Sequence, residues 1–83
     1  MPLFMDIHHL DGGVSIGDVV KAHEADLAHQ DKYEVKYRRY WVDEDGGTIF
    51  CLVEAPSAEA ASTVHREAHG LVADSVHLVQ EGS

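Results

Sequence analysis

The middle of the chain reads YEVKYRRYWVDEDGGTIFCLVE over residues 33–54. The part up to Val42 is aromatic and β-branched, an acidic stretch with two glycines follows it, and residues 48–54 again have the composition of a strand. Two runs of this kind, separated by a short turn that contains glycine, are typical of a β-hairpin. We therefore expect two strands, over residues 33–42 and 48–54, and a turn between them.

The sequence on each side of this hairpin predicts one helix and one further strand. Before it, residues 3–9 alternate between apolar and polar side chains, and Ser15 precedes an apolar stripe with helical spacing. After it, Pro56 ends the strand and Ser57 is a good N-cap for a helix. The expected order is strand 3–9, a helix from Ser15 to about residues 30–32, strand 33–42, strand 48–54, a helix from Ser57 to about residues 68–69, and strand 75–80.

This β-α-β-β-α-β order predicts an α+β, ferredoxin-like fold, in which a four-stranded antiparallel sheet carries both helices on one face. The elements use the whole chain, so we expect one domain over residues 1–83. We expect the apolar side chains of the first strand to face the helices, and its polar ones, Asp6 and His8, to face the opposite side. Large apolar side chains on an uncovered sheet face favour a homodimer formed through the sheet.

Composition limits the classes of partner. The chain has 15 acidic and 6 basic residues and a formal net charge of -9, so we expect binding to neither nucleic acid nor an anionic membrane surface. No apolar run approaches the roughly 20 residues of a membrane helix. Cys51 is the single cysteine, which favours a reducing compartment and therefore the cytoplasm.

Histidine is unusually frequent in this chain. The seven histidines are at positions 8, 9, 23, 29, 65, 69 and 77. Such an excess, together with many acids, is compatible with metal binding or with a charge that responds to pH. The predicted topology brings His8, His9, His69 and His77 to one end of the molecule.

Some of these residues are spaced so that two side chains can share a cation. The pairs are Asp6 with His8 on a strand, His23 with Asp26 on a helix, and His65 with His69 on a helix. Each pair also has an interpretation without metal: a carboxylate that fixes a histidine tautomer, a histidine packed in the core, or a solvated pair of rings.

The sequence contains no pattern that indicates catalysis. It has no phosphate-binding glycine-rich loop and no nucleophile elbow, and a nucleophilic Cys51 would require a base that the sequence does not identify. We interpret Cys51 as a packed thiol. We expect no catalytic residues and no organic cofactor.

Several short motifs, taken together, resemble one known family. The motifs are Phe4-Met-Asp-x-His8, Ala22-His-x-x-Asp26-Leu27, Trp41-x-Asp43, Phe50-Cys-Leu-x-Glu54-Ala-Pro56 and Val64-His-Arg-Glu-Ala-His69-Gly70. They resemble the small nickel-binding, ferredoxin-like proteins long catalogued as a domain of unknown function, and the resemblance covers nearly the whole chain.

The resemblance implies a homodimer that binds nickel through histidine and carboxylate ligands. The positions that match the family pattern are Asp6, His8, His23, Asp26, Glu54, His65 and His69. His9, His29 and His77 lie outside the pattern and are treated as accessory. Zinc and copper are alternative ions, because imidazole suits nickel, copper and zinc alike.

We therefore expect a cytoplasmic, metal-binding protein in nickel buffering, storage or delivery rather than an enzyme. The alternative is a small dimeric α+β barrel enzyme with a pocket on the uncovered sheet face. Its candidate lining is Asp6, His8, Tyr37, Trp41 and Glu54. A third hypothesis is an interaction module whose histidines tune association with pH.

Overall fold

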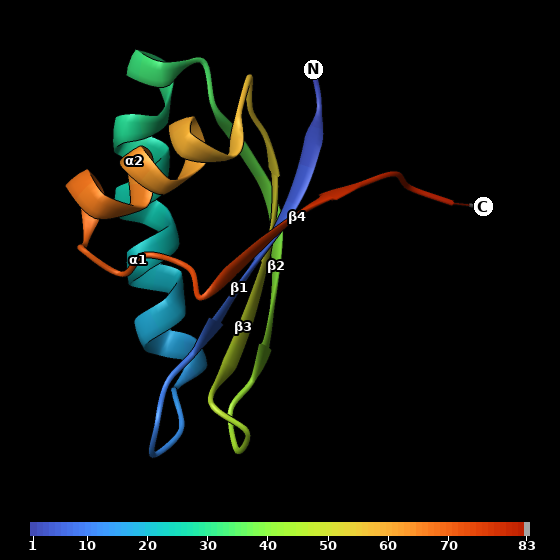
Figure 1. The fold of residues 1–83 in the computed structure, drawn as a ribbon. Helices are drawn as coiled ribbons and strands as arrows, with labels where there is room; N and C mark the ends of the chain where they lie inside the picture. The colour runs from blue at the N-terminus through green and yellow to red at the C-terminus, as the bar shows by residue number, and fades with distance from the viewer. Residues whose placement is uncertain (83) are drawn as a thin grey trace.

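The computed structural model describes residues 1–82, which form two layers. Figure 1 shows both helices against the same face of one sheet. The elements in chain order are β1 (Leu3–His9), α1 (Ile16–His29), a short 3-10 helix η1 (Gln30–Tyr33), β2 (Lys36–Asp43), β3 (Thr48–Glu54), α2 (Ala58–Ala68) and β4 (Ser75–Val79). The predicted α+β, βαββαβ fold is confirmed.

The sheet has the strand order β2-β3-β1-β4, and every neighbouring pair is antiparallel. β1 therefore lies inside the sheet, between β3 and β4. Leu3 pairs with Glu54 of β3 on one side and with Val79 of β4 on the other. The predicted antiparallel pairing of the first and last strands is confirmed, and side chains of β1 have neighbours on both sides.

The core lies between the sheet and the helices. In β3, Ile49, Cys51 and Val53 are buried and alternate with partly exposed residues. They pack with Ala61 and Val64 of α2, which are fully buried. Burial of each aliphatic side chain of this size stabilises the fold by about 1.5–3 kcal/mol. The core is thus small and is made mainly of valine and alanine.

The prediction for the two faces of β1 is wrong. Asp6 and His8 are buried, with exposed fractions of 1% and 6%, and they share the helix side of the sheet with the buried row of β3. The apolar residues Met5 and Ile7 instead lie on the open face, where they are only partly buried. The physical reason is that His65 of α2 supplies hydrogen bonds inside the core, so the polar row of β1 can be buried.

A row of apolar side chains crosses the open face of the sheet. Phe50 of β3 pairs with Ile7 of β1 and with Trp41 of β2, and Leu52 of β3 pairs with Met5 of β1. The side chain of Trp41 is 48% exposed. We call these five residues the apolar sheet face.

Strand β2 begins later than predicted and is irregular. Glu34 has a left-handed backbone conformation (φ 59°), which ends η1 and delays the strand to Lys36. The register then shifts between Tyr37 and Arg39, as in a β-bulge. Tyr37 and Tyr40 are three residues apart, and a regular strand would place them on opposite faces. Because of the bulge, they pair with Val53 and Cys51, which share the helix side.

Both helices begin at the predicted caps. The Ser15 hydroxyl accepts a hydrogen bond from the Asp18 amide at 3.2 Å, and the Ser57 hydroxyl accepts one from the Ala60 amide at 3.1 Å. Each satisfies an amide that would otherwise have no partner in the first turn. Gly70, with φ +78°, follows the end of α2, and its amide donates to the His65 carbonyl at 2.9 Å.

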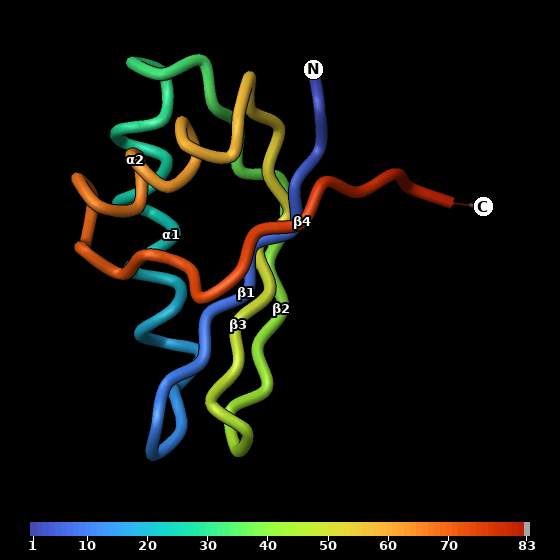
Figure 2. The backbone as a smooth tube through the Cα atoms, in the orientation of Figure 1, coloured from blue at the N-terminus to red at the C-terminus, as the bar shows by residue number. Residues whose placement is uncertain are grey.

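Figure 2 shows the chain after β4 leading away from the body of the molecule. Within residues 1–82, neither helix has the length and apolar character needed to cross a bilayer.

The hairpin turn between β2 and β3 is fixed to the end of β1. The Leu10 amide donates to the Gly47 carbonyl at 2.7 Å, and Gly47 has φ +66°. A Cβ at Gly47 would collide with the backbone carbonyl of Leu10 and would lie 3.3 Å from the Cα of Gly13.

We expect Gly47→Ala to lower the free energy of unfolding by about 3 kcal/mol, because a strained φ and a backbone collision add. Gly12→Ala is the matched control, since Gly12 also has a positive φ (+86°) but its Cβ would meet nothing within 4 Å. It should cost about 1 kcal/mol. Urea unfolding of both variants measures the difference, and equal losses would contradict the role of the Leu10 contact.

Candidate metal centre

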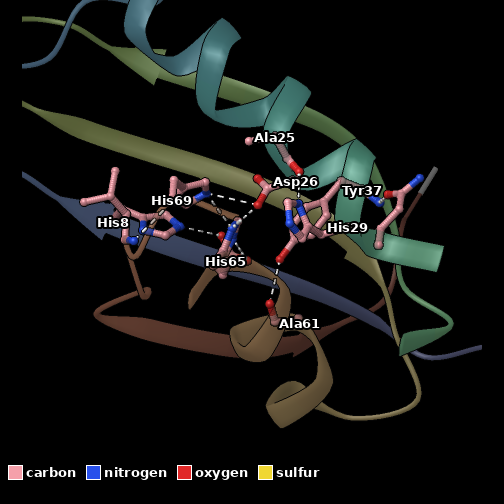
Figure 3. A network of polar contacts seen from close by, with 11 residues as sticks. His8, Ala25, Asp26, His29, Tyr37, Ala61, His65 and His69 are labelled. Atoms are coloured by element: carbon pink, nitrogen blue, oxygen red, sulfur yellow. Dashed lines mark hydrogen bonds and ion pairs between the residues drawn. The ribbon is translucent and has the colours of Figure 1, made fainter. Parts of the chain in front are cut away.

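The imidazole of His65 lies at the centre of a buried polar cluster (Figure 3). His65 is on α2 and is 1% exposed. Its Nε2 is 3.0 Å from Oδ2 of Asp6, and its Nδ1 is 2.8 Å from Oδ1 of Asp26. A ring that has a carboxylate oxygen at each nitrogen donates from both, so His65 is an imidazolium that bridges two carboxylates.

Strand β1 contributes the first carboxylate and a second histidine. Asp6 and His8 are two residues apart and therefore point to the same side of the strand. The Nε2 of His8 donates to Oδ1 of Asp6 at 3.1 Å. The rings of His8 and His65 meet edge to face, with centroids 4.8 Å apart. The Asp6 carboxylate thus accepts a hydrogen bond from a histidine at each oxygen.

The second carboxylate, Asp26, comes from the end of α1 and is 3% exposed. Its Oδ1 is also 3.0 Å from Nε2 of His69, which follows the last turn of α2. The Nδ1 of His69 accepts a hydrogen bond from the Leu71 amide at 3.1 Å, so Nε2 carries the proton of that ring. Two histidines one helical turn apart therefore converge on a single oxygen of Asp26.

Tyr37 of β2 closes one side of the cluster. Its ring packs against the His65 ring with centroids 4.7 Å apart, and its hydroxyl donates to the Ala61 carbonyl at 2.9 Å. Burial raises the pKa of Tyr37, so the phenol stays protonated. Tyr37 holds His65 in place and excludes water from this side.

Cys51 lies directly beside the Asp6 carboxylate. The two residues are partners in the β1–β3 register, and the thiol is buried. Burial and the negative charge of Asp6 raise the pKa of Cys51 well above its usual range. In the metal-free protein it is therefore a protonated thiol.

The cluster strongly shifts the protonation of its members. Burial alone would raise the pKa of Asp6, but hydrogen bonds from His65 and His8 outweigh it and lower the pKa to about 2. Burial likewise opposes the shift at Asp26, whose pKa is lowered by hydrogen bonds from His65 and His69. For His65, the two carboxylates outweigh burial and raise its pKa to about 9.

Two carboxylates and one imidazolium leave a surplus of negative charge inside the protein. Buried charges are costly unless they are paired or coordinate a metal ion. The electrostatics of the cluster therefore favour the uptake of a cation.

The donor atoms form two overlapping groups of a size suited to one ion each. The groups are Asp6, His8, Cys51 and His65, and Asp26, His65 and His69. Within each group the ligand atoms lie within 4.8 Å of one another. A cavity of about 20 Å³ adjoins both groups, which is room for about one water molecule or one ion. Nitrogen and oxygen donors of this kind suit nickel, zinc and copper.

The structure brings together five of the seven predicted ligands. They are Asp6, His8, Asp26, His65 and His69. His23 borders the same cavity, and its ring packs on Tyr40 with centroids 4.7 Å apart.

The seventh residue, Glu54, does not join the cluster. It lies on the other side of β3 from the buried row, and its Oε1 accepts from Arg38 at 2.7 Å. That ion pair lowers the pKa of Glu54. Glu54 thus neutralises a surface arginine and contributes no donor atom to either group.

The accessory histidines also lie outside the cluster. His9 and His77 are exposed, and His77 pairs with Met5 on the open face of the sheet. The sequence predicts that they gather with His8 and His69 at one end of the molecule, but neither joins the buried cluster: His9 follows His8 on β1 and so points to the opposite face of the sheet, and His77 lies beside Met5 on that same open face. His29 donates from Nδ1 to the Ala25 carbonyl at 2.9 Å, inside its own helix.

The sequence did not identify the roles of Cys51 and Tyr37. The sequence predicts only a packing role for Cys51, whereas the strand register places it opposite Asp6. The signal that could have identified Cys51 is the pairing of the first strand with the second strand of the hairpin, because that pairing sets Cys51 beside a residue of the first strand. The sequence places Tyr37 in the alternative enzyme pocket on the open face, whereas the bulge in β2 turns it to the helix side.

Comparison with known proteins identifies similar proteins whose descriptions mention nickel. Residues 4–79 match the family model described as nickel responsive protein SCO4226-like. The crystal structure of SCO4226 from Streptomyces coelicolor A3(2) is similar over 98% of this chain and 99% of that chain, with 41% sequence identity and a TM-score of 0.90. No curated protein matches the chain. The family resemblance expected from the sequence is confirmed.

We expect the stability of the metal-free protein to depend on the charge of His65. A folded-state pKa of about 9, against 6.5 for the free residue, stabilises the fold fully below pH 6.5, and this contribution is lost as pH rises toward 9. The charged ring of His65 thus contributes about 3 kcal/mol to the free energy of unfolding. The lowered pKa of Asp6 affects stability at the acidic end of the pH range, since its stabilising contribution is lost as pH falls from 3.8 toward 2.

Urea unfolding in the presence of a chelator, at pH values across both windows, measures these two limits. The control is His65→Gln, which has no titrating ring at this position and should show no decline between pH 6.5 and about 9. A wild-type stability that stays constant over that alkaline range would show that His65 is not charged in the folded state.

Proposed function

Because the chain belongs to the SCO4226-like nickel-responsive protein family, we propose that it binds nickel at the buried cluster around His65 and acts in nickel buffering, storage or delivery. The observation that carries the proposal is the pair of buried carboxylates, Asp6 and Asp26, held together by the proton-bearing ring of His65. A divalent ion that displaces one proton of this ring adds one net positive charge and so cancels the surplus negative charge.

The present distances support direct replacement of protons by a metal ion. Neighbouring donors in the cluster are 2.8 to 3.1 Å apart, as in the His65–Asp26 and His8–Asp6 contacts. An octahedron with bonds of ~2.1 Å has edges of ~3.0 Å, so the donors already have the spacing of coordinated ligands. Little movement of these donor atoms toward one another is therefore required for binding.

Nickel must compete with protons at this site. The ring of His65 carries a proton at each nitrogen in the metal-free protein, and a ligating nitrogen must lose its proton. Since the pKa of His65 is about 9, the apparent affinity for nickel should fall as the pH falls below that value. Uptake in neutral solution and release in acid suit a protein that carries or stores an ion.

The size of the site favours metal handling over catalysis on an organic substrate. The cavity beside the donors is about 20 Å³, far below the roughly 300 Å³ or more of a small-molecule pocket. The residues of the alternative enzyme pocket also do not share a face: Asp6, His8 and Tyr37 lie on the helix side, and Trp41 lies on the open side.

We further propose that the protein is a homodimer formed through the apolar sheet face. Five large apolar side chains, among them the 48% exposed Trp41, lie on that face. A second copy offers the same surface, so two faces can cover each other across a two-fold axis. We also propose that the protein works in the cytoplasm, where a free thiol such as Cys51 stays reduced.

Titration calorimetry with nickel on chelator-stripped, tag-free protein tests the site. We expect binding with release of protons, and a loss of affinity of about tenfold or more in His69→Ala and a larger loss in His65→Ala, because each removes a ligand. His77→Ala is the matched control, since His77 is exposed on β4 and outside both donor groups. No binding of nickel, or equal affinity in His69→Ala and His77→Ala, would overturn the proposal.

Sedimentation velocity tests the dimer. We expect the wild type to be dimeric, and Trp41→Lys to be monomeric at the same concentration, because a buried unpaired charge is costly. Ile16→Lys is the control, since Ile16 is equally exposed (48%) but belongs to α1. A monomeric wild type, or dimers in both variants, would exclude this face as the interface.

A further inference from the structure

We infer that Cys51 is a metal ligand, and that it makes the inner donor group a four-coordinate site for a thiophilic divalent ion such as Zn²⁺. The inner group consists of Asp6, His8, Cys51 and His65. The inference rests on the proposed metal-binding function and adds to it the class of ion that this half of the cluster selects.

The position of Cys51 follows from the sheet register. Asp6 and Cys51 are directly paired on neighbouring strands, and both point to the helix side. His8 is on the same side of β1, and His65 reaches the same point from α2. The four ligand atoms, one from each residue, lie within 4.8 Å of one another, and all four residues are buried.

A thiol at this place is not explained by packing alone. Its two neighbours in the buried row of β3, Ile49 and Val53, are aliphatic and belong to the hydrophobic core. Cys51 belongs to the same buried cluster, but its cross-strand partner in β1 is the carboxylate-bearing Asp6. A valine or an alanine would fill the row without placing sulfur beside three other donors.

The two donor groups differ in chemistry. The inner group offers one sulfur, two nitrogens and one oxygen, which is the number and kind of ligand found in tetrahedral zinc sites. The outer group, Asp26, His65 and His69, offers only nitrogen and oxygen, which suits an ion of higher coordination number such as Ni²⁺. His65 faces the inner group with Nε2 and the outer group with Nδ1.

The binding step at the inner group is a simple exchange of protons for a cation. The S–H bond of Cys51 breaks as the sulfur–metal bond forms, and the proton passes to solvent. His65 likewise loses the proton on Nε2 and keeps the one on Nδ1, which still donates to Asp26. The neutral ring of His8 keeps its single proton, which moves from Nε2 to Nδ1 so that Nε2 is free to coordinate. Nothing is oxidised or reduced, and the two released protons balance the two charges of the ion.

Cobalt(II) is the probe that tests this inference, because a thiolate ligand gives it a near-ultraviolet charge-transfer band and four-coordination gives it intense visible bands. Cys51 is the single cysteine of the chain, so a thiolate band in the wild-type protein can arise only from this residue. We expect the chelator-stripped, reduced protein to show both features on titration with Co²⁺, and Zn²⁺ to abolish them by displacement.

Two variants separate the donor groups. Cys51→Ser should lose the charge-transfer band and bind Zn²⁺ at least about tenfold more weakly in competition with a chromophoric chelator. His69→Ala, which alters only the outer group, should keep the band. Circular dichroism of the metal-free variants establishes that each is folded, and Cys51→Ala serves if the serine variant is not.

The outcomes distinguish this inference from the proposed function. If the wild-type protein binds neither Co²⁺ nor Ni²⁺, the proposed function fails and the inference fails with it. If it binds metal without a thiolate band, or if Cys51→Ser has the same cobalt spectrum and the same Zn²⁺ affinity, the inference alone is overturned. If the variants cannot be produced in folded form, the cobalt spectrum of the wild-type protein still shows whether Cys51 coordinates the ion.

Discussion

One charged ring holds the interior of this small protein together. His65 donates to Asp6 of β1 and to Asp26 of α1, so it connects α2 both to the sheet and to the other helix. The apolar part of the core is mostly valine and alanine, and it surrounds this polar centre on several sides. If the ring were removed, Asp6 would keep only its hydrogen bond with His8 and Asp26 only its contact with His69. The two buried carboxylates would then lose the positive charge between them, which is costly in a low-dielectric interior. The fold and the site therefore depend on the same contact.

The topology explains why the donors meet where they do. β1 is an inner strand, so Asp6 has β3 on one side and β4 on the other, while His8 pairs with Ile49 of β3, and both residues are buried. α2 crosses above them and presents His65 and His69 one turn apart. An arrangement of five ionisable side chains at the join of three elements cannot form before those elements pack, and it requires no ligand from a loop tip.

The sequence predicted the order of the elements, both serine caps and the pairing of the first and last strands, because these follow from local patterns and from connection rules. It also predicted five residues that gather in the cluster. It failed where tertiary packing outweighed a local pattern: the polar row of β1 is buried because α2 brings His65, and Tyr37 changes face through a bulge. Glu54 fitted the family motif but is paired with Arg38.

The hydrogen bond between the Leu71 amide and Nδ1 of His69 links the cluster to the protein surface. It fixes the proton of His69 on Nε2, the nitrogen that faces Asp26. An ion bound at that nitrogen would drive the proton to Nδ1, where it would oppose the Leu71 N–H. The turn after α2 would then have to open, and Leu71 and Val72, which are 42% and 43% exposed, would change position with it. Binding of an ion in the buried cluster would in this way change the exposed surface of the molecule.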